Sequence, residues 1–187
     1  MPAKPQVAVL VGSLRRESLN LKAAKAVAEL AQDRLAFEFA QIGDLPPYNE
    51  DADGDEPPEL WTEFRDELHA ADAILFATPE YNRSVPGVLK NAIDVASRPY
   101  GKSALANKPA AVMSASKGAI GGFGANHHLR QMAVFLDMPM LQQPEMYIGG
   151  AGKLFDEQGV LVNEDTRKLF GKFANAFAAW IELHAKR

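Results

Sequence analysis

The chain of 187 residues has the length of one domain, and we expect residues 1–187 to fold as a single unit. Its net charge of −4 excludes the basic surface of a nucleic-acid-binding protein, and its lack of cysteine excludes disulfides and thiolate catalysis, so any redox chemistry needs a cofactor. The opening MPAKPQ lacks the apolar stretch of a signal peptide and no apolar run approaches the roughly 20 residues that cross a bilayer, so we expect a cytoplasmic protein.

The first third of the sequence predicts a strand, a helix and a second strand, followed by a loop. Residues 7–11 form a continuous apolar run, typical of a strand buried on both faces of a parallel sheet. A helix follows from Ser18, and the alternation in residues 35–42 predicts a strand nearer an edge. The expected buried stripe of this helix is Ala23, Val27, Leu30 and Arg34. Residues 43–58, rich in Pro, Gly and Asp, predict a long solvated loop.

The remaining sequence continues the alternation of helices and strands. Residues 73–78 and 110–116 predict buried strands, and a short last strand is expected around residues 140–141, resuming at 146–148. The helices between them have apolar stripes at Leu60, Phe64 and Leu68, at Leu89, Ile93 and Ala96 after Pro86, and at Leu129, Met132, Ala133 and Leu136. After a hairpin centred on Gly159, Asn163 caps a last helix whose buried stripe is Phe170, Phe173, Phe177, Trp180 and His184.

This repeated order of strand and helix, without an internal repeat or a linker, determines the fold class that we predict. It is typical of an α/β protein with a doubly wound sheet of about five parallel strands. Such sheets bind ligands at the carboxyl ends of their strands, where the connecting loops meet. We therefore expect the chemistry of this protein in the loops after Val11, Thr78 and Ser114.

The loop after Val11, GSLRRESLN, carries more polar groups than a tight turn requires. The predicted helix N-terminus brings together Ser13, Ser18, Asn20 and free backbone N–H groups, and the helix dipole there favours an anion. Arg15 adds a positively charged guanidinium group. The pattern suits a terminal phosphate monoester, because both the Walker lysine motif and the Gly-x-Gly-x-x-Gly spacing are missing. The alternative, a capped helix beside a solvated arginine pair, stays open at this point.

The other two loops suit a flat ring. In TPEYNRSVPGVLKNAID, a stiff exit at Pro79 precedes Tyr81, Asn82 and Ser84, which combine a flat apolar face with edge hydrogen-bonding groups. In SASKGAIGGFGANHH, glycines allow the backbone to approach a ring and to offer its N–H groups. A plain turn with an exposed tyrosine and a merely permissive glycine loop are the alternatives. All three loops belong to one edge of the predicted sheet, which strengthens the ligand interpretation.

The stretches GSLRRESLN, PEYNRSVPGVLKNAID and SKGAIGG with the following HLRQ resemble the NADPH-dependent FMN reductase family, which includes quinone, chromate and azo reductases. The resemblance implies a flavodoxin-like three-layer sandwich with strand order 2-1-3-4-5 and a non-covalent FMN. It implies that the FMN phosphate is held by Ser13, Arg15, Ser18, Leu19 and Asn20. It implies that the ring is flanked by Pro79, Glu80, Tyr81, Asn82 and Ser84, and bordered on its other side by Ser116, Lys117, Gly118, Gly121 and Gly122. Homodimers or homotetramers are also implied.

Two departures from the family pattern concern subunit contacts and substrate access. Many relatives have a tryptophan after the aspartate of the second motif, whereas Asp94 is followed here by Val95. Many also carry an arginine or a tyrosine near Gly124 and His127. No metal site is expected, because the acidic run DADGDE lacks the glycine and glutamate of a calcium loop, and because His127 and His128 point about 100° apart on a predicted helix.

We therefore expect an enzyme in which NADPH or NADH reduces bound FMN, which then passes electrons to a quinone, chromate, an azo or nitro compound, or free flavin. The flavin carries the difficult step, so no catalytic acid or base is assigned to the protein. Two alternatives are kept. One is a flavodoxin-type electron carrier without NAD(P)H reductase activity, although Arg15 gives this phosphate loop more cationic character than such carriers tend to have. The other is a phosphate-recognising sensor or hydrolase domain that never binds flavin.

Overall fold

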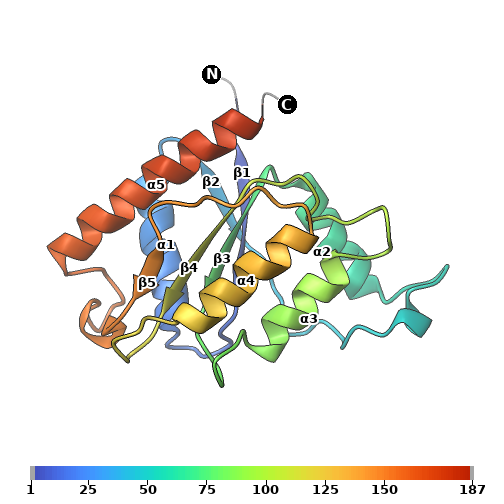
Figure 1. The fold of residues 1–187 in the computed structure, drawn as a ribbon, viewed down its shortest axis with the longest axis horizontal. Coiled ribbons are helices and arrows are strands. Elements are labelled where there is room, and N and C mark those ends of the chain that lie inside the picture. Colours follow the sequence, from blue (N-terminus) through green and yellow to red (C-terminus); the bar gives the residue numbers. More distant parts are fainter. Residues whose placement is uncertain (1–2, 186–187) are drawn as a thin grey trace.

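The computed structural model describes residues 3–185 as one parallel sheet between two layers of helices (Figure 1). The strands are β1 (Gln6–Val11), β2 (Ala36–Phe39), β3 (Ala73–Thr78), β4 (Ala110–Ala115) and β5 (Met146–Ile148). All neighbouring strands run parallel, in the order β2-β1-β3-β4-β5. The predicted α/β class and strand order are confirmed.

Helices cover both faces of the sheet. They are α1 (Leu19–Ala31), α2 (Glu59–Ala70), α3 (Gly87–Ala96), α4 (Phe123–Phe135) and α5 (Glu164–His184), with short 3₁₀ turns at Glu50–Ala52 and Ala151–Lys153. One face packs against α1 and α5, and the other packs against α2, α3 and α4. Among the described helices, none combines the length and the apolar character that a membrane crossing requires.

The packing of the core explains why the sequences of the strands are unbroken apolar runs. Every residue of β3 and β4 is buried, because both faces of the sheet are covered. Alternate residues serve opposite layers: Leu75 belongs to the cluster with α1 and α5, whereas Phe76 belongs to the cluster with the other three helices. Phe170, Phe173 and Phe177 of α5 are fully buried, as their spacing predicts. This rigid sheet fixes the loops at its carboxyl edge.

Three loops meet at that edge, which is the lower edge in Figure 1. We name residues 12–18, after β1, loop 1; residues 79–86, after β3, loop 2; and residues 116–122, after β4, loop 3. Val11 pairs with Ala77, and Thr78 pairs with Ser114, so β1, β3 and β4 end at nearly the same level. The predicted meeting of the three loops is therefore confirmed.

Several sequence-based expectations differ from the structure. Residues 140–141 make only an isolated bridge, between Met140 and Ala110, and Leu60, expected in the stripe of α2, is exposed. The predicted strand at residues 35–42 forms sheet pairs only over Ala36–Phe39, at the sheet edge. The stripe predicted for α1 holds at Ala23 and Val27, but Leu30 is exposed, and Arg34 lies beyond the helix end with its guanidinium 2.8 Å from a Glu182 carboxylate oxygen. Arg34 therefore belongs to the surface contact between α1 and α5.

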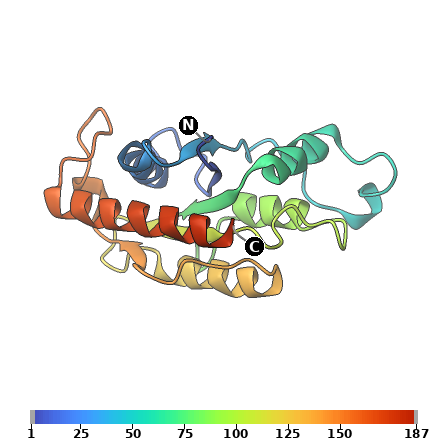
Figure 2. The ribbon, with the colours of Figure 1, turned by 90° about the horizontal axis from the view of Figure 1, so that it is seen from above.

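The segment 43–58 is the long, largely exposed loop that its composition predicts, with a 3₁₀ turn at Glu50–Ala52, but it is also fixed to the helices at two points. One end is fixed by Asn91 of α3, whose side chain accepts a hydrogen bond from the Tyr48 N–H at 2.7 Å and donates to the carbonyls of Leu45 and Pro46. In Figure 2 this segment extends at the opposite end of the molecule from the hairpin near residue 159. Leu14 of loop 1 lies 3.1 Å from where a Cβ on Gly43 would be, so the segment also borders the carboxyl edge.

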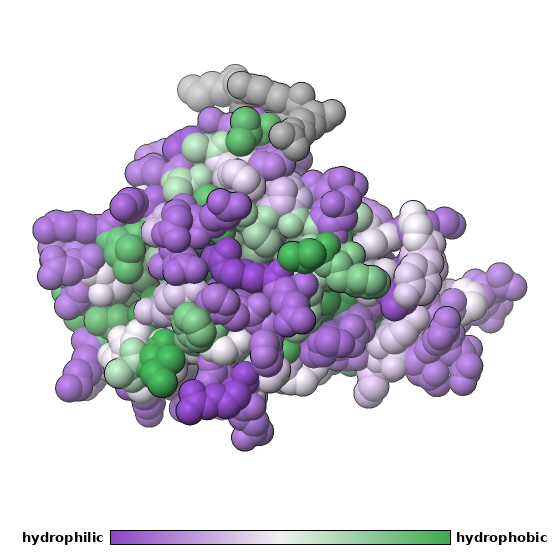
Figure 3. Space-filling view, in the orientation of Figure 1, coloured by the Kyte–Doolittle hydropathy of each residue, from purple (hydrophilic) through white to green (hydrophobic). Residues whose placement is uncertain are grey.

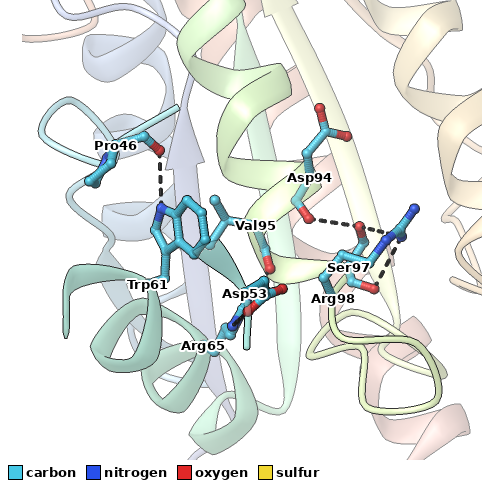
Figure 4. A network of polar contacts seen from close by, with 8 residues as sticks. All are labelled: Pro46, Asp53, Trp61, Arg65, Asp94, Val95, Ser97 and Arg98. Atoms are coloured by element: carbon cyan, nitrogen blue, oxygen red, sulfur yellow. Dashed lines mark hydrogen bonds and ion pairs between the residues drawn. The ribbon is translucent and has the colours of Figure 1, made fainter. Parts of the chain in front are cut away.

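The other end of this segment is fixed by a nearly buried ion pair. Arg65 of α2 donates to both carboxylate oxygens of Asp53, at 2.7 and 2.8 Å, and its Nε donates to the Val95 carbonyl at 2.9 Å (Figure 4). The side chains of Arg65 and Asp53 are only 10% and 5% exposed. Beside them, the Trp61 indole donates to the Pro46 carbonyl. Asp53 is therefore a buried anchor, which also removes it from any calcium loop.

Candidate functional site

Loop 1 presents unused hydrogen-bond donors at the start of α1. Ser18 is the N-cap residue, and its hydroxyl accepts from the Leu21 N–H at 3.2 Å. Within the described part of the chain, the N–H groups of residues 13–17 donate to no backbone or side-chain acceptor. Arg15 and Arg16 are exposed, and Ser13 is half-buried. These donors and cations surround a helix N-terminus, which is the arrangement that binds an anion.

Asn20 has a different position from the one that a direct phosphate ligand would take. Its side chain is buried and exchanges two hydrogen bonds with Ala115: the amide accepts from the N–H at 2.9 Å and donates to the carbonyl at 3.1 Å. Ala115 lies one residue beyond Ser114, where the pairing of β4 with β3 ends. Asn20 thus takes the place of a missing strand partner and joins loop 1 to the start of loop 3.

Loop 2 contains a tight two-residue turn. Tyr81 and Ser84 exchange backbone hydrogen bonds of 2.9 and 3.0 Å, while Asn82 and Arg83 have φ values of 51° and 67°. Positive φ at both central residues is the pattern of a type I′ turn, which asparagine tolerates but which is costly for arginine. The Tyr81 side chain is 46% exposed. The turn therefore presents a flat aromatic face and polar edges outside the sheet.

Two side chains of loop 2 attach it to α4. Glu80 Oε2 accepts from the N–H groups of Gly124 and Ala125, at 2.6 and 3.2 Å. The Ser84 hydroxyl lies 2.9 Å from His128 Nδ1. The sequence-based analysis missed both contacts, and it placed Glu80 beside the ring only by resemblance. Loop 2 is thus fixed to the helix that begins where loop 3 ends.

The glycines of loop 3 are required first by the packing of the chain itself. Gly121 and Gly122 have φ values of 68° and 80°. A Cβ on Gly121 would lie 2.5 Å from the Tyr147 carbonyl carbon, and one on Gly122 would lie 2.9 Å from the Ser114 Cβ. In contrast, a Cβ on Gly118 would meet only the Ser116 hydroxyl, at 3.8 Å. The open part of the loop is therefore its first half, where Lys117 and Gly118 are exposed.

An aromatic cluster lies beyond loop 3, between α4 and β5. The Tyr147 hydroxyl donates to Glu145 Oε1 at 2.9 Å and lies 2.9 Å from His127 Nε2, while Phe123 packs against the His127 ring with centroids 4.1 Å apart. Burial and the hydrogen bond to Glu145 raise the pKa of Tyr147 to about 12. Tyr147 is therefore a neutral hydrogen-bonding residue at physiological pH.

The two adjacent histidines have separate partners, as their expected directions on a helix require. His127 faces Tyr147, and His128 faces Ser84. Within residues 3–185, no group of three His, Asp or Glu side chains has the arrangement of a metal site. The donor groups at the carboxyl edge are N–H groups, hydroxyls and guanidinium groups, which suit an anion rather than a cation.

This donor set fits FMN. Loop 1 offers free N–H groups, a serine hydroxyl and two arginines for a phosphate monoester. Tyr81 offers an exposed ring face, and the open first half of loop 3 leaves room for a flat group to approach the backbone. The structure brings the predicted residues of all three loops to one edge of the sheet, with Asn20 and Glu80 joining the loops to each other.

Comparison with known proteins gives one matching family model and several close relatives. The model described as NADPH-dependent FMN reductase matches residues 5–153, which include all three loops. A quinone reductase of Pseudomonas putida is 60% identical over 178 residues, covering 95% of each chain. A 2-hydroxy-1,4-benzoquinone reductase of a Burkholderia species is 48% identical, covering 94% of this chain and 96% of that protein.

A solved structure agrees with this similarity at the level of the whole fold. The flavoenzyme NAD(P)H:(acceptor) oxidoreductase FerB from Paracoccus denitrificans superposes with a TM-score of 0.90 at 44% identity. The superposition covers 96% of this chain and 98% of that one. The likeness therefore extends beyond the residues matched by the family model, to α5.

Proposed function

The chain belongs to the NADPH-dependent FMN reductase family, and on this basis we propose that it transfers electrons from NADPH or NADH through bound FMN to a quinone. It is an NAD(P)H-dependent FMN reductase, and FMN is its cofactor. The observation that carries the proposal is that the family match covers all three loops of the carboxyl edge. Relatives named as quinone reductases support a quinone as the acceptor.

The cofactor and the protein have separate parts in this function. Bound FMN supplies the redox chemistry, because it can take a hydride from a nicotinamide and give electrons to an acceptor. The chain's own groups bind and orient, so no side chain is assigned as a catalytic acid or base. The exposure of Tyr81 supports an open face at which donor and acceptor alternate, and we expect ping-pong kinetics.

We assign the phosphate to loop 1 and the ring to loops 2 and 3. The free N–H groups of residues 13–17 and the exposed Arg15 support the first assignment. The proposed phosphate-side residues are Ser13, Arg15, Ser18, Leu19 and Asn20, with Ser18 and Asn20 acting by shaping the loop. The proposed ring-side residues are Pro79, Glu80, Tyr81, Asn82 and Ser84 on one side and Ser116, Lys117, Gly118, Gly121 and Gly122 on the other.

The phosphate assignment is tested by comparing FMN with riboflavin, which lacks the phosphate. Titration of the apoprotein by flavin fluorescence gives both dissociation constants. We expect Arg15→Ala to weaken FMN binding about tenfold and to leave riboflavin binding unchanged, because a charge-assisted contact to a phosphate is lost. Arg34→Ala, which removes the same charge near the other end of α1, is the control. Equal effects of Arg15→Ala on both flavins would contradict the assignment.

The activity is tested with the purified protein alone. It should be yellow, and it should oxidise NADPH when a quinone is added. Bleaching of the flavin by NADPH without any partner protein separates a reductase from a flavodoxin-type carrier. A colourless protein that FMN does not reconstitute would instead favour the phosphate-recognising alternative. We propose that chromate, azo and nitro compounds and free flavin are further acceptors, and turnover measured across this panel ranks them.

We also propose that the protein forms homodimers or homotetramers and works in the cytoplasm, where NADPH and NADH are available. Exposed apolar residues support an association surface: Val134 and Phe135 are 83% and 73% exposed near the end of α4, and a groove of about 520 Å³ separates α3 from α4. Figure 3 shows hydrophobic side chains gathered over both ends of α4. Light scattering during gel filtration measures the oligomeric state.

A further inference from the structure

A single carboxylate joins the two loops that we assign to the flavin ring. We infer that Glu80 is a positioning residue that sets the distance between loop 2 and loop 3 by capping α4, the helix that follows loop 3. The inference rests on the proposed function, because it concerns the ring site of that same cofactor. It differs from a direct contact with the ring, which the resemblance alone implies.

The first turn of α4 lacks the cap that helices usually obtain from their own sequence. Its N-cap residue is Gly122, which has no side chain to accept a hydrogen bond. The Glu80 carboxylate accepts instead from the N–H groups of Gly124 and Ala125. These are the donors that an N-cap side chain normally satisfies, and a negative charge is favourable at this end of a helix. The cap of α4 therefore comes from loop 2.

Close packing at Gly124 shows that loop 2 and α4 are held at a fixed distance from each other. A Cβ on Gly124 would lie 2.9 Å from both the Arg83 carbonyl oxygen and Glu80 Oε2, so α4 and the tip of loop 2 approach as closely as glycine allows. The Glu80 side chain is only 14% exposed. One turn further along α4, His128 meets the Ser84 hydroxyl. Loop 2 thus contacts two successive turns of α4.

This attachment has a direct consequence for a ring held between the two loops. Stacking and edge hydrogen bonds depend on the positions of the loop backbones to within about 0.5 Å. Without the Glu80 carboxylate, Gly124 and Ala125 lose their acceptor, and the hydrogen bond between Ser84 and His128 is the one that still joins loop 2 to α4 among the described residues. Loop 2 would then become ordered only when flavin binds, and the free-energy cost of this ordering would lower the flavin affinity.

The test uses apoprotein of the wild type and of Glu80→Ala, Glu80→Gln and Glu59→Ala. Glu59 is the matched control, because it is an exposed acid in the first turn of α2. Two quantities are measured: the dissociation constants of FMN and riboflavin, and hydrogen exchange of the backbone N–H groups of Gly124 and Ala125. Circular dichroism and urea unfolding report whether each variant remains folded.

We expect Glu80→Ala to weaken FMN and riboflavin equally, by about tenfold, and to speed exchange at Gly124 and Ala125. Glu80→Gln keeps an acceptor oxygen and should restore most of the affinity, whereas Glu59→Ala should change neither quantity. The equal loss for both flavins separates a ring-side effect from the phosphate-side effect expected for Arg15→Ala. Unchanged flavin affinity in a folded Glu80→Ala protein would overturn the inference.

A second variant keeps the test decisive if Glu80→Ala does not fold. In Gly124→Ala the added methyl group on α4 would clash with the Arg83 carbonyl of loop 2 and so move the loop away from the helix. We expect this variant to bind both FMN and riboflavin more weakly as well. If wild-type apoprotein binds no flavin, the proposed function is wrong, whereas the exchange rates at Gly124 and Ala125 still report whether Glu80 caps α4. Unchanged exchange in both Glu80 variants would then refute the capping role itself.

Discussion

At the scale of single residues, short polar side chains near the carboxyl edge act mainly on the backbone of other loops. Asn20 completes the pairing of β4 where β3 has ended, and Glu80 caps a helix that begins more than 40 positions later in the chain. Neither side chain leaves its full hydrogen-bonding capacity for a ligand. The motif residues of these loops therefore include some that hold the loops in place, such as Asn20 and Glu80, and others that are exposed at the carboxyl edge, such as Arg15 and Tyr81.

The contact between Asn20 and Ala115 gives a prediction about stability. Asn20→Ala should lower the free energy of unfolding by about 2–4 kcal/mol, because a buried N–H and a buried carbonyl each lose their partner. Urea denaturation measures the change. Asn175→Ala, at an exposed position on α5, should shift it by less than about 0.5 kcal/mol. Similar values for the two variants would show that water replaces Asn20 at Ala115.

The sequence predicts contacts within one helix turn better than contacts that depend on the tertiary fold. The start of α1 at Ser18 could be predicted, because an N-cap side chain acts within one turn of its own helix. The partners of Asn20 and Glu80 lie 95 and 44 positions away, so they depend on how the strands are ordered. The glycines were assigned to a ring approach, yet Gly121 and Gly122 are dictated first by β5 and β4.

At the scale of elements, the apolar periodicity located the strands and the long helices of the described residues, and the errors lie at the ends of elements. The connection 43–58 is the exposed loop that was predicted, but its two anchors were not foreseen. Composition predicted solvation for this connection because Pro, Gly and Asp are common in loops. It could not reveal that Asp53 meets Arg65, since a buried ion pair depends on the position of α2 relative to α3. The connection 43–58 is a loop that its contacts with α2 and α3 hold beside the carboxyl edge.

The ion pair that anchors this connection gives a second prediction. Asp53→Ala should destabilise the protein by about 3–5 kcal/mol, because the nearly buried Arg65 guanidinium loses its charge partner. The double variant Asp53→Leu/Arg65→Met removes both charges and should recover most of that loss. Urea unfolding of the single and double variants measures the coupling, with the exposed Asp55→Ala as a control. A double variant as unstable as the single one would contradict a simple charge imbalance.

At the scale of the whole molecule, the strand order and the meeting of three loops could be predicted because the connections of a parallel sheet follow strict rules. The homodimer or homotetramer is implied by the family resemblance alone, because the rules for connections within one sheet concern a single chain. Acidic groups dominate the charge of the molecule, which is −4. The dependence of its stability on pH is therefore determined by the burial and the charged neighbours of individual carboxylates.

One such carboxylate gives the third prediction. Burial, together with the charge of Glu38, raises the pKa of Glu67 above its ordinary 4.5, so ionisation costs stability as pH rises through the folded-state value. Glu67→Gln should therefore be more stable than the wild type at pH 7, by less than about 1 kcal/mol, and this gain should vanish below pH 4.5. Urea unfolding across this range measures it, with the exposed Glu63→Gln on the same helix as a control. A gain that persists in acid would indicate a cause other than ionisation.

The hydrogen bond from the Ala115 N–H to the Asn20 side chain also bears on how the protein is made and handled. Because the chain satisfies this buried N–H with its own side chain, we expect the backbone around Ala115 to fold before the vitamin-derived cofactor arrives. We therefore expect a cell short of riboflavin to contain folded apoenzyme. Flavin lost during purification should then be regained by mixing, without a denaturation and refolding cycle.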